Sequence, residues 1–189
     1  MRSFFSCPLC GGALERGEHI CRCPNRHSFD LAREGYVNLL PANLRHSKAP
    51  GDDGEMAAAR TRFLDGGWYS PLREALCALA ERYARPGAAL LDAGCGEGWY
   101  TQALGSVIAR KGGRTAGVDL SKPAVKKAAR RCPGGEIAVA SVYRLPAADA
   151  AADLLVDCFA PWRPWSTPVC CAPAGPSSMW SPDPGTCGS

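Results

Sequence analysis

Four cysteines and two histidines lie between residues 6 and 30, in the stretch SCPLCGGALERGEHICRCPNRHSFD. Cys7 and Cys10 form a Cys-x-x-Cys pair followed by two glycines, as expected for a turn that directs two thiolates at one point. Cys23 and His27 form a second pair, four residues apart. Two such pairs are typical of a closed tetrahedral Zn²⁺ site, which stabilises structure and leaves no open position for catalysis.

Two other residues compete for the third ligand position. Cys21 lies two residues before Cys23 and could replace it, and His19 is a weaker competitor. A segment this rich in loops cannot build a core without a metal crosslink. We therefore expect zinc to order this end of the chain without taking part in a reaction.

A second motif, AALLDAGCGEGWYTQAL, spans residues 88–104. A short apolar run is followed by three glycines and the start of a helix, which is the crossover at which doubly wound α/β folds bind nucleotides. Asp119 ends the next apolar run, about twenty residues beyond the glycines, where a carboxylate can accept hydrogen bonds from ribose hydroxyls. The pair of features predicts a ligand that contains adenosine.

The spacing of the glycines separates two classes of ligand. Dehydrogenases seat a pyrophosphate with Gly-x-Gly-x-x-Gly, whereas the pattern here is Asp92-x-Gly94-x-Gly96-x-Gly98. This pattern resembles the cofactor loop of class I S-adenosylmethionine-dependent methyltransferases. We expect these four residues and Asp119 to bind S-adenosylmethionine, and we keep a dehydrogenase and a purely structural glycine turn as alternatives.

The elements that must position these residues follow from hydrophobic spacing. Apolar residues recur at helical spacing, and Ser121 is a suitable N-cap for a further helix. The predicted helices cover residues 55–64, 71–83, 99–104 and 121–131, and the predicted strands cover 27–40, 88–91, 115–120, 137–140 and 153–157. This alternation predicts a doubly wound α/β sheet, with the strand in 27–40 packed against the zinc knuckle.

Composition sets the broad class of protein. The chain has 189 residues and a formal net charge of +4, which is compatible with a nucleic-acid partner without requiring one. The sequence has no apolar run of about 18 residues and no signal-peptide pattern, so we expect no membrane association. Eleven cysteines then indicate metal ligands in a reducing compartment, and we expect a cytoplasmic protein.

Eight motifs follow one another in the order and spacing of the RlmA-type 23S rRNA (guanine-N1)-methyltransferases. They are SCPLC, CPNRHSFD, AREGYVNLLP, PGD, FLDGGWYSPLR, LLDAGCGEGWYT, GVDLSK and VASVYRLP, and the resemblance runs over residues 5–161. The resemblance implies a zinc domain beside a methyltransferase fold, with S-adenosylmethionine as cofactor. It also implies that the substrate is a guanine in a hairpin of 23S rRNA.

The resemblance also implies particular residues. It places zinc at Cys7, Cys10, Cys23 and His27, which favours Cys23 over Cys21, and cofactor contacts at Tyr69, Gly96 and Glu97. Basic residues are candidates for RNA phosphate contacts. They are Arg26, Arg33, Arg45, Lys48, Lys122, Lys126, Lys127, Arg130 and Arg131, of which the last five equally suit the solvated face of a helix. A homodimer is a further assembly that we consider.

Residues 161–189 depart from the family pattern. They contain seven of the sixteen prolines, three of the five tryptophans, and no leucine or isoleucine. Such a run cannot extend a parallel sheet. Back-translated two nucleotides out of phase, it yields strings that suit the family's missing helix, strand and His segment. We therefore hypothesise a frameshift near Trp162.

These inferences divide the chain into four segments. We expect a zinc-binding domain at 1–40, a linker and helix at 41–70, the first half of a methyltransferase domain at 71–160, and an out-of-frame, disordered tail at 161–189. The predicted fold is thus an incomplete Rossmann-like class I methyltransferase sheet with a small zinc-ribbon-like domain. For such a chain, a non-catalytic zinc-stabilised RNA-binding fragment and a small-molecule methyltransferase are the alternative functions.

Overall fold

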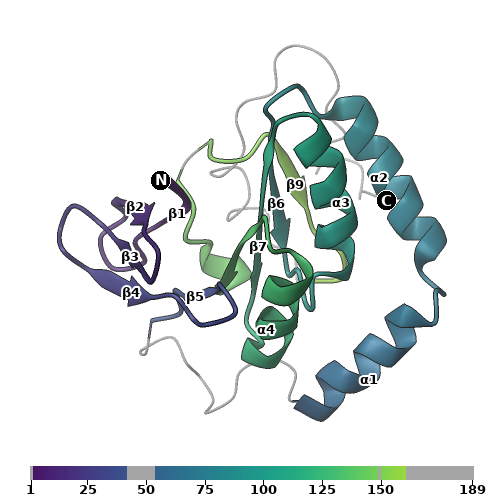
Figure 1. Cartoon of the computed structure of the whole chain (residues 1–189), viewed down its shortest axis with the longest axis horizontal. Helices are drawn as coiled ribbons and strands as arrows, with labels where there is room; N and C mark the ends of the chain where they lie inside the picture. Colours follow the sequence, from purple (N-terminus) through teal and green to yellow (C-terminus); the bar gives the residue numbers. More distant parts are fainter. Residues whose placement is uncertain (1, 42–53, 149, 161–189) are drawn as a thin grey trace, which may run out of the picture.

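The computed structural model describes residues 2–41, 54–148 and 150–160, which form two sheets and the helices that cover one of them (Figure 1). The first sheet is an antiparallel ribbon in the order β1-β2-β3-β4. Its strands are β1 (Arg2–Ser6), β2 (Ala13–Arg16), β3 (Ile20–Arg22) and β4 (Ser28–Asp30). Arg45, Lys48 and the segment 161–189, for which we made predictions, lie outside the described residues.

The second sheet is parallel, with the strand order β5-β8-β7-β6-β9. Its strands are β5 (Val37–Asn38), β6 (Ala89–Ala93), β7 (Arg114–Asp119), β8 (Glu136–Val139) and β9 (Leu154–Val156), and the helices are α1 (Gly54–Asp65), α2 (Ser70–Tyr83), α3 (Trp99–Arg110), α4 (Lys122–Arg131) and the short η2 (Val142–Arg144). All five residues of β6 are buried, as expected for a central parallel strand. The predicted α/β fold is confirmed.

The prediction of one strand in 27–40 is correct only in part. Residues 28–30 form β4 in the ribbon, whereas residues 37–38 form β5 at the edge of the parallel sheet. The turn between them includes Gly35, whose φ of 92° is a left-handed conformation that glycine adopts without strain. Arg16 holds this turn by donating a hydrogen bond of 2.7 Å to the Gly35 carbonyl. The chain therefore passes from one sheet to the other within seven residues.

The two faces of the parallel sheet have different covers. On one face, α2, α3 and α4 bury the side chains of Leu90, Ile137 and Val139. On the other face, Leu91, Ala116 and Val118 share a core with residues of the ribbon. Figure 1 shows the ribbon on one side of the sheet and the helices on the other. The ribbon thus serves as a cover layer for the sheet.

Strand β1 makes the connection between the ribbon and the sheet. Phe4 and Phe5 are each 2% exposed and belong to the shared core. Glu136, which begins β8, accepts hydrogen bonds from the Ser3 hydroxyl at 2.5 Å and the Phe4 amide at 2.9 Å. The Ser6 amide donates to the Pro146 carbonyl at 2.8 Å. These contacts fix the ribbon's position on the sheet.

Among the residues that the structure describes, none of the helices has the length and apolar character needed to cross a bilayer. The longest of them, α2, has 14 residues. A spanning helix requires about 20 predominantly apolar residues.

Candidate metal centre and cofactor pocket

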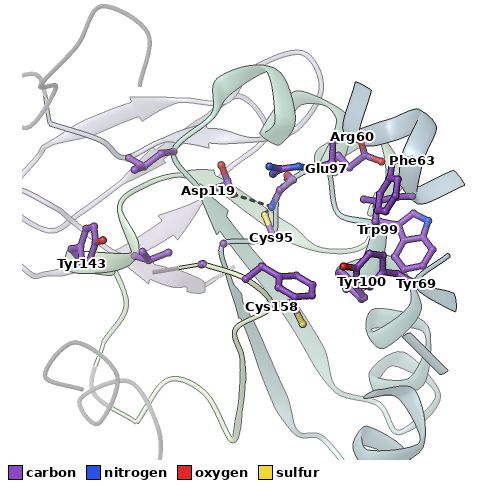
Figure 2. Close-up of a pocket in the computed structure, with 17 residues that line it drawn as sticks. Arg60, Phe63, Tyr69, Cys95, Glu97, Trp99, Tyr100, Asp119, Tyr143 and Cys158 are labelled. Carbon is purple, nitrogen blue, oxygen red and sulfur yellow. Dashed lines mark hydrogen bonds between the residues drawn. The ribbon is translucent and has the colours of Figure 1, made fainter. Parts of the chain in front are cut away.

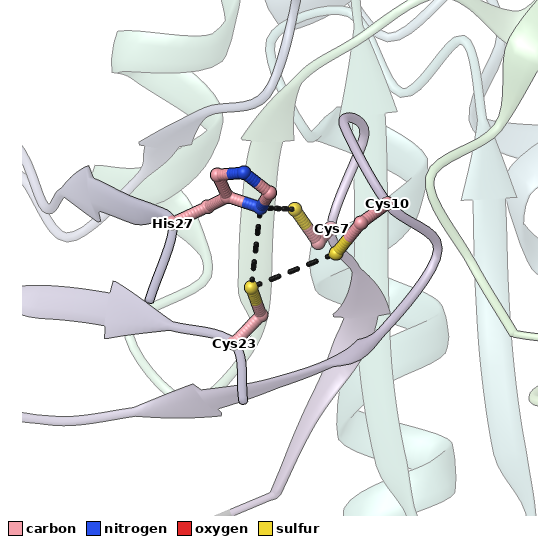
Figure 3. Close-up of side chains that lie close together, drawn as sticks. All are labelled: Cys7, Cys10, Cys23 and His27. Carbon is pink, nitrogen blue, oxygen red and sulfur yellow. Dashed lines mark hydrogen bonds between the residues drawn. The ribbon is translucent and has the colours of Figure 1, made fainter. Parts of the chain in front are cut away.

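Four side chains of the ribbon converge on one point (Figure 3). The ligand atoms of Cys7, Cys10, Cys23 and His27 all lie within 4.8 Å of one another. The Sγ atoms of Cys10 and Cys23 are 3.7 Å apart, and the Nδ1 atom of His27 lies 3.5 Å from the Sγ atoms of Cys7 and Cys23. The four predicted ligands are therefore together in the fold.

These distances fit a tetrahedral zinc site. With Zn–S bonds of about 2.3 Å and Zn–N bonds of about 2.0 Å, a tetrahedron has S···S edges of about 3.8 Å and S···N edges of about 3.5 Å. The observed separations of 3.7 and 3.5 Å agree with those edges. All four positions are taken by side chains, so the donor set suits a structural Zn²⁺ ion.

The two competing ligands point elsewhere. Cys21 is fully buried in the core that the ribbon shares with the sheet, and burial raises the pKa of its thiol. The side chain of His19 is 86% exposed and lies beside Glu18. Neither is in the cluster. Cys21 lies within β3, whereas Cys23 follows the end of that strand and His19 precedes its start. The geometry supports Cys23 as the third ligand.

A pocket of about 400 Å³ lies at the carboxyl ends of the parallel strands (Figure 2). Five predicted cofactor residues line it, namely Tyr69, Gly94, Gly96, Glu97 and Asp119. This edge is where open α/β sheets bind ligands, and the volume is in the range of about 300–1,000 Å³ found for small-molecule sites.

Gly96 presents its backbone directly to this pocket. Its φ is 54°, and a Cβ atom added there would meet nothing within 4 Å. The glycine loop is fastened to the next strand, because the Gly96 amide donates a hydrogen bond of 3.0 Å to the Asp119 carboxylate. The loop therefore leaves a space at Gly96 that a side chain would fill, as expected where a ligand approaches the backbone closely.

Asp119 ends β7 and lines the same pocket. Its second carboxylate oxygen accepts a hydrogen bond of 2.8 Å from the Ser121 amide at the start of α4. The two backbone hydrogen bonds fix the orientation of the carboxylate, and a carboxylate can accept about four hydrogen bonds in all. This placement is suited to ribose hydroxyls, as the sequence predicts.

Two predicted cofactor residues do not line the pocket. Gly98 packs against α4, since a Cβ atom at this position would lie 2.9 Å from the Ala128 Cα atom. Asp92 is 1% exposed and lies behind the loop, where the Thr101 hydroxyl donates a 2.5 Å hydrogen bond to it. Gly98 thus allows α4 to pack closely on the loop, and Asp92 joins β6 to α3.

Burial raises the pKa of Asp92 to about 7, opposed by the Thr101 hydrogen bond and reinforced by the charges of Asp119 and Asp157. Between about pH 4 and pH 7 the folded protein keeps a proton that the unfolded chain has lost, so its stability falls as pH rises through this window. We expect Asp92→Asn to remove this pH dependence of stability, which amounts to at most about 1.4 kcal/mol per pH unit.

The measurement is the melting temperature of both proteins between pH 4.5 and 8. The melting temperature of the variant, relative to that of the wild type, should rise with pH up to about 7 and then stay constant. Two parallel curves would show that the Asp92 carboxyl group titrates normally.

Glu97 joins the glycine loop to two helices. Its side chain is 2% exposed and accepts hydrogen bonds from the Thr61 hydroxyl of α1 and, at 2.8 Å, from Arg131 of α4. Lys127 lies 3.9 Å away and also donates to Thr61 at 2.5 Å. The Glu97 carboxylate therefore lines the pocket, and Arg131 and Lys127 of α4 balance its charge.

The interpretation of the α4 basic residues as a solvated face fits Lys122, Lys126 and Arg130, which are exposed, but not Lys127 and Arg131, which pair with the buried Glu97. Arg131 pairs with Asp65 and Glu97, and Lys127 pairs with Glu97. Lys126 and Arg130 both reach Glu34, at 3.1 Å. Spacing within the helix could not show these pairs, because the partners come from segments 30 or more residues away.

Sequence reasoning missed most of the aromatic wall of the pocket. Tyr69 makes edge contacts with Phe63 and Phe159, at ring-centroid distances of 5.6 and 5.5 Å. Trp99 and Tyr100 form a second edge pair at 4.9 Å. The available signals were Trp68 and Tyr69 in a glycine turn and the two aromatics after Gly98, all of which suit anchoring in the core equally well.

The chain matches known proteins in two regions. Residues 5–48 match the family described as RlmA, N-terminal, and residues 91–160 match the family described as methyltransferase domain. A 23S rRNA (guanine(748)-N(1))-methyltransferase from Streptomyces fradiae is 40% identical over 164 residues, which are 85% of this chain and 57% of that protein. A protein of Micromonospora griseorubida, named as a candidate 23S rRNA (guanine-N1)-methyltransferase, is 40% identical over 174 residues, 82% of this chain and 57% of that protein.

A solved structure shares the fold. It is a candidate S-adenosylmethionine-dependent methyltransferase from Methanococcus maripaludis, with a TM-score of 0.53 and 18% identity, covering 66% of this chain and 62% of that one. Fold and family matches together define a methyltransferase-type α/β domain joined to a zinc ribbon.

The chain thus joins a match to the RlmA N-terminal family with a methyltransferase domain, and it is similar to 23S rRNA (guanine-N1)-methyltransferases. The resemblance predicted from the sequence is confirmed. The chain spans 57% of the length of the two curated relatives named above.

Proposed function

We propose that this chain is the zinc ribbon and cofactor-binding part of an enzyme that methylates N1 of a guanine in a 23S rRNA hairpin. One observation carries the proposal: a tetrahedral Cys₃His cluster and a pocket built on a glycine loop occur in one chain that is 40% identical to such enzymes. Similar folds serve many substrates, so it is the combination that favours rRNA.

The chemistry is a direct methyl transfer. S-Adenosylmethionine, when bound, supplies a methyl group on a positively charged sulfur. Guanine N1 forms the new bond to carbon, the sulfur keeps the electron pair of the old bond, and the N1 proton passes to a base or to water. The main requirement on the protein is alignment of the two reactants with exclusion of water.

The residues of this chain would contribute positioning. Asp119 would receive the ribose hydroxyls, and Gly96 would allow the cofactor to approach the backbone. Tyr69 would contact the cofactor within the aromatic wall, which excludes water. RNA would be recognised through phosphate contacts and by stacking of a displaced base.

Cofactor binding is the first test. We expect the chain to bind S-adenosylhomocysteine with 1:1 stoichiometry in isothermal titration calorimetry, and Asp119→Ala to bind at least about tenfold more weakly, because it loses charge-assisted hydrogen bonds. Asp30→Asn, on β4 outside the pocket, is the matched control. Binding unaffected by Asp119→Ala would contradict the assignment of the pocket.

Methyl transfer is the second test. A 23S rRNA transcript is incubated with S-adenosylmethionine and either the chain or a version whose reading frame is restored near Trp162, and its nucleosides are analysed by mass spectrometry. Formation of 1-methylguanosine by either protein supports the proposal. If neither protein forms it, or if methyl transfer to small molecules occurs without RNA, the proposed substrate is wrong.

A further inference from the structure

The hydroxyl group of Tyr100 is a buried polar group that the fold itself does not use. Tyr100 lies in the first turn of α3, directly after the glycine loop, and is 8% exposed. Its side chain lines the pocket, yet its hydroxyl oxygen is sealed from solvent and has no hydrogen-bond partner among the described residues. The hydroxyl of the next residue, Thr101, by contrast donates a hydrogen bond to Asp92.

The position of the ring is fixed by its neighbours. Trp99 meets the Tyr100 ring edge-on, with 4.9 Å between the ring centroids and an interplanar angle of 89°. The Arg73 guanidinium lies 4.0 Å from the centroid of the Trp99 ring. A buried hydroxyl without a partner destabilises a fold, and phenylalanine would pack in the same place without that cost. The hydroxyl is therefore better explained by a partner that the ligand provides.

The two ends of the pocket differ in what they can bind. Asp119 and Tyr143 lie on one side of the view in Figure 2, and Tyr69, Trp99 and Tyr100 lie on the other, with the glycine loop between them. If Asp119 receives the ribose, the part of the cofactor beyond the ribose extends past the glycine loop towards Tyr100. The ribose carries adenine on one side and the methionine moiety on the other. We assign the methionine moiety to the side of Tyr100, because its carboxylate is the stronger acceptor for a buried hydroxyl donor.

We infer that the Tyr100 hydroxyl binds the amino-acid end of the cofactor and so holds the sulfur over the glycine loop. This inference rests on the proposed function, because it assumes that the pocket takes S-adenosylmethionine. Burial, reinforced by the neighbouring Cys158, raises the pKa of Tyr100, so the hydroxyl keeps its proton at neutral pH and can donate to a carboxylate. A hydrogen bond to a charged partner is the stronger kind.

The test compares two ligands with the variant Tyr100→Phe. S-Adenosylhomocysteine carries the amino-acid end, whereas 5′-methylthioadenosine keeps the adenosine and the sulfur but lacks that end. We expect the Kd of S-adenosylhomocysteine to rise about tenfold, equivalent to about 1.4 kcal/mol, and the Kd of 5′-methylthioadenosine to change less than about twofold. The melting temperature without ligand should stay unchanged or rise, since no protein hydrogen bond is removed.

Tyr83→Phe is the matched control, because it removes a hydroxyl from a half-exposed tyrosine of α2 outside the pocket. It should alter neither Kd. The inference is overturned if Tyr100→Phe weakens both ligands equally, if it weakens neither, or if it lowers the melting temperature of the ligand-free protein. If the wild-type chain binds neither ligand, the proposed function fails together with the inference. If the wild type binds both ligands and only the expected effect of Tyr100→Phe is missing, the inference alone fails.

Discussion

Removal of zinc is expected to unfold the ribbon and to lower the melting temperature of the whole chain by at least about 10 °C. Structural zinc sites contribute about 10–16 kcal/mol in small zinc-finger peptides, and a loss of 1 kcal/mol lowers the melting temperature of a chain this size by about 2–4 °C. The effect reaches the parallel sheet because Phe4 and Phe5 of β1 belong to the core that covers one of its faces. Without the ribbon, that face is exposed to water.

Two cysteine variants separate the metal site from simple packing. Cys23→Ala removes a ligand, whereas Cys21→Ala, two residues earlier, removes a buried thiol of the core. Zinc content per chain and thermal unfolding, with and without a chelator, are measured for both. We expect Cys23→Ala to lose zinc and Cys21→Ala to keep one ion per chain with a smaller loss of stability. The reverse pattern would show that Cys21 is the ligand.

Alanine at two neighbouring glycines is expected to have opposite consequences. Both residues have positive φ, 54° at Gly96 and 79° at Gly98, so either substitution costs about 1–2 kcal/mol in backbone strain. At Gly96 the new methyl group would enter the open pocket, and we expect cofactor affinity to fall at least about tenfold while the fold persists. At Gly98 it would collide with the backbone of α4 at Ala128, so we expect the fold itself to be lost.

Circular dichroism and calorimetric titration with S-adenosylhomocysteine measure the two effects separately. Gly134→Ala is the control, because a Cβ atom there meets nothing within 4 Å and Gly134 lies outside the pocket. A Gly96→Ala protein that binds the ligand as the wild type does would mean that the cofactor avoids the glycine loop. A stable Gly98→Ala protein would mean that α4 can move away from it.

The parts of the fold that the sequence predicts are those with local signals. The apolar run before Gly94, the N-cap at Ser121 and the Cys-x-x-Cys pair each depend on neighbouring residues, and the corresponding strand, helix and metal knuckle are found. Helix α4 shows the rule directly, since the Ser121 hydroxyl accepts a hydrogen bond from the Ala124 amide at 3.4 Å. Motif spacing likewise placed Asp119 at the pocket, since a strand end has a fixed position in the fold.

The missed features depend on contacts between distant segments. Nothing near Asp92 shows that α3 would enclose it, and nothing near Lys127 or Arg131 shows that Glu97 would be their partner. The cover that β1 provides for the sheet was missed for the same reason, because Phe4 read as part of a separate zinc domain. Hydrophobic periodicity identifies which residues are buried, but it does not show which helix or sheet packs against them.

The attachment of β1 to β8 also sets an order of events during synthesis. The zinc ligands lie within residues 7–27, so the knuckle can close soon after it leaves the ribosome. Ser3 and its partner Glu136 are 133 residues apart, and at about 5–20 residues per second the nascent ribbon waits on the order of ten seconds for that partner. During this interval the rings of Phe4 and Phe5 have no sheet to cover. The ribbon is made before the sheet that it covers, so it is among the last parts of this chain to reach its final place, and its aromatic rings need protection from aggregation until then.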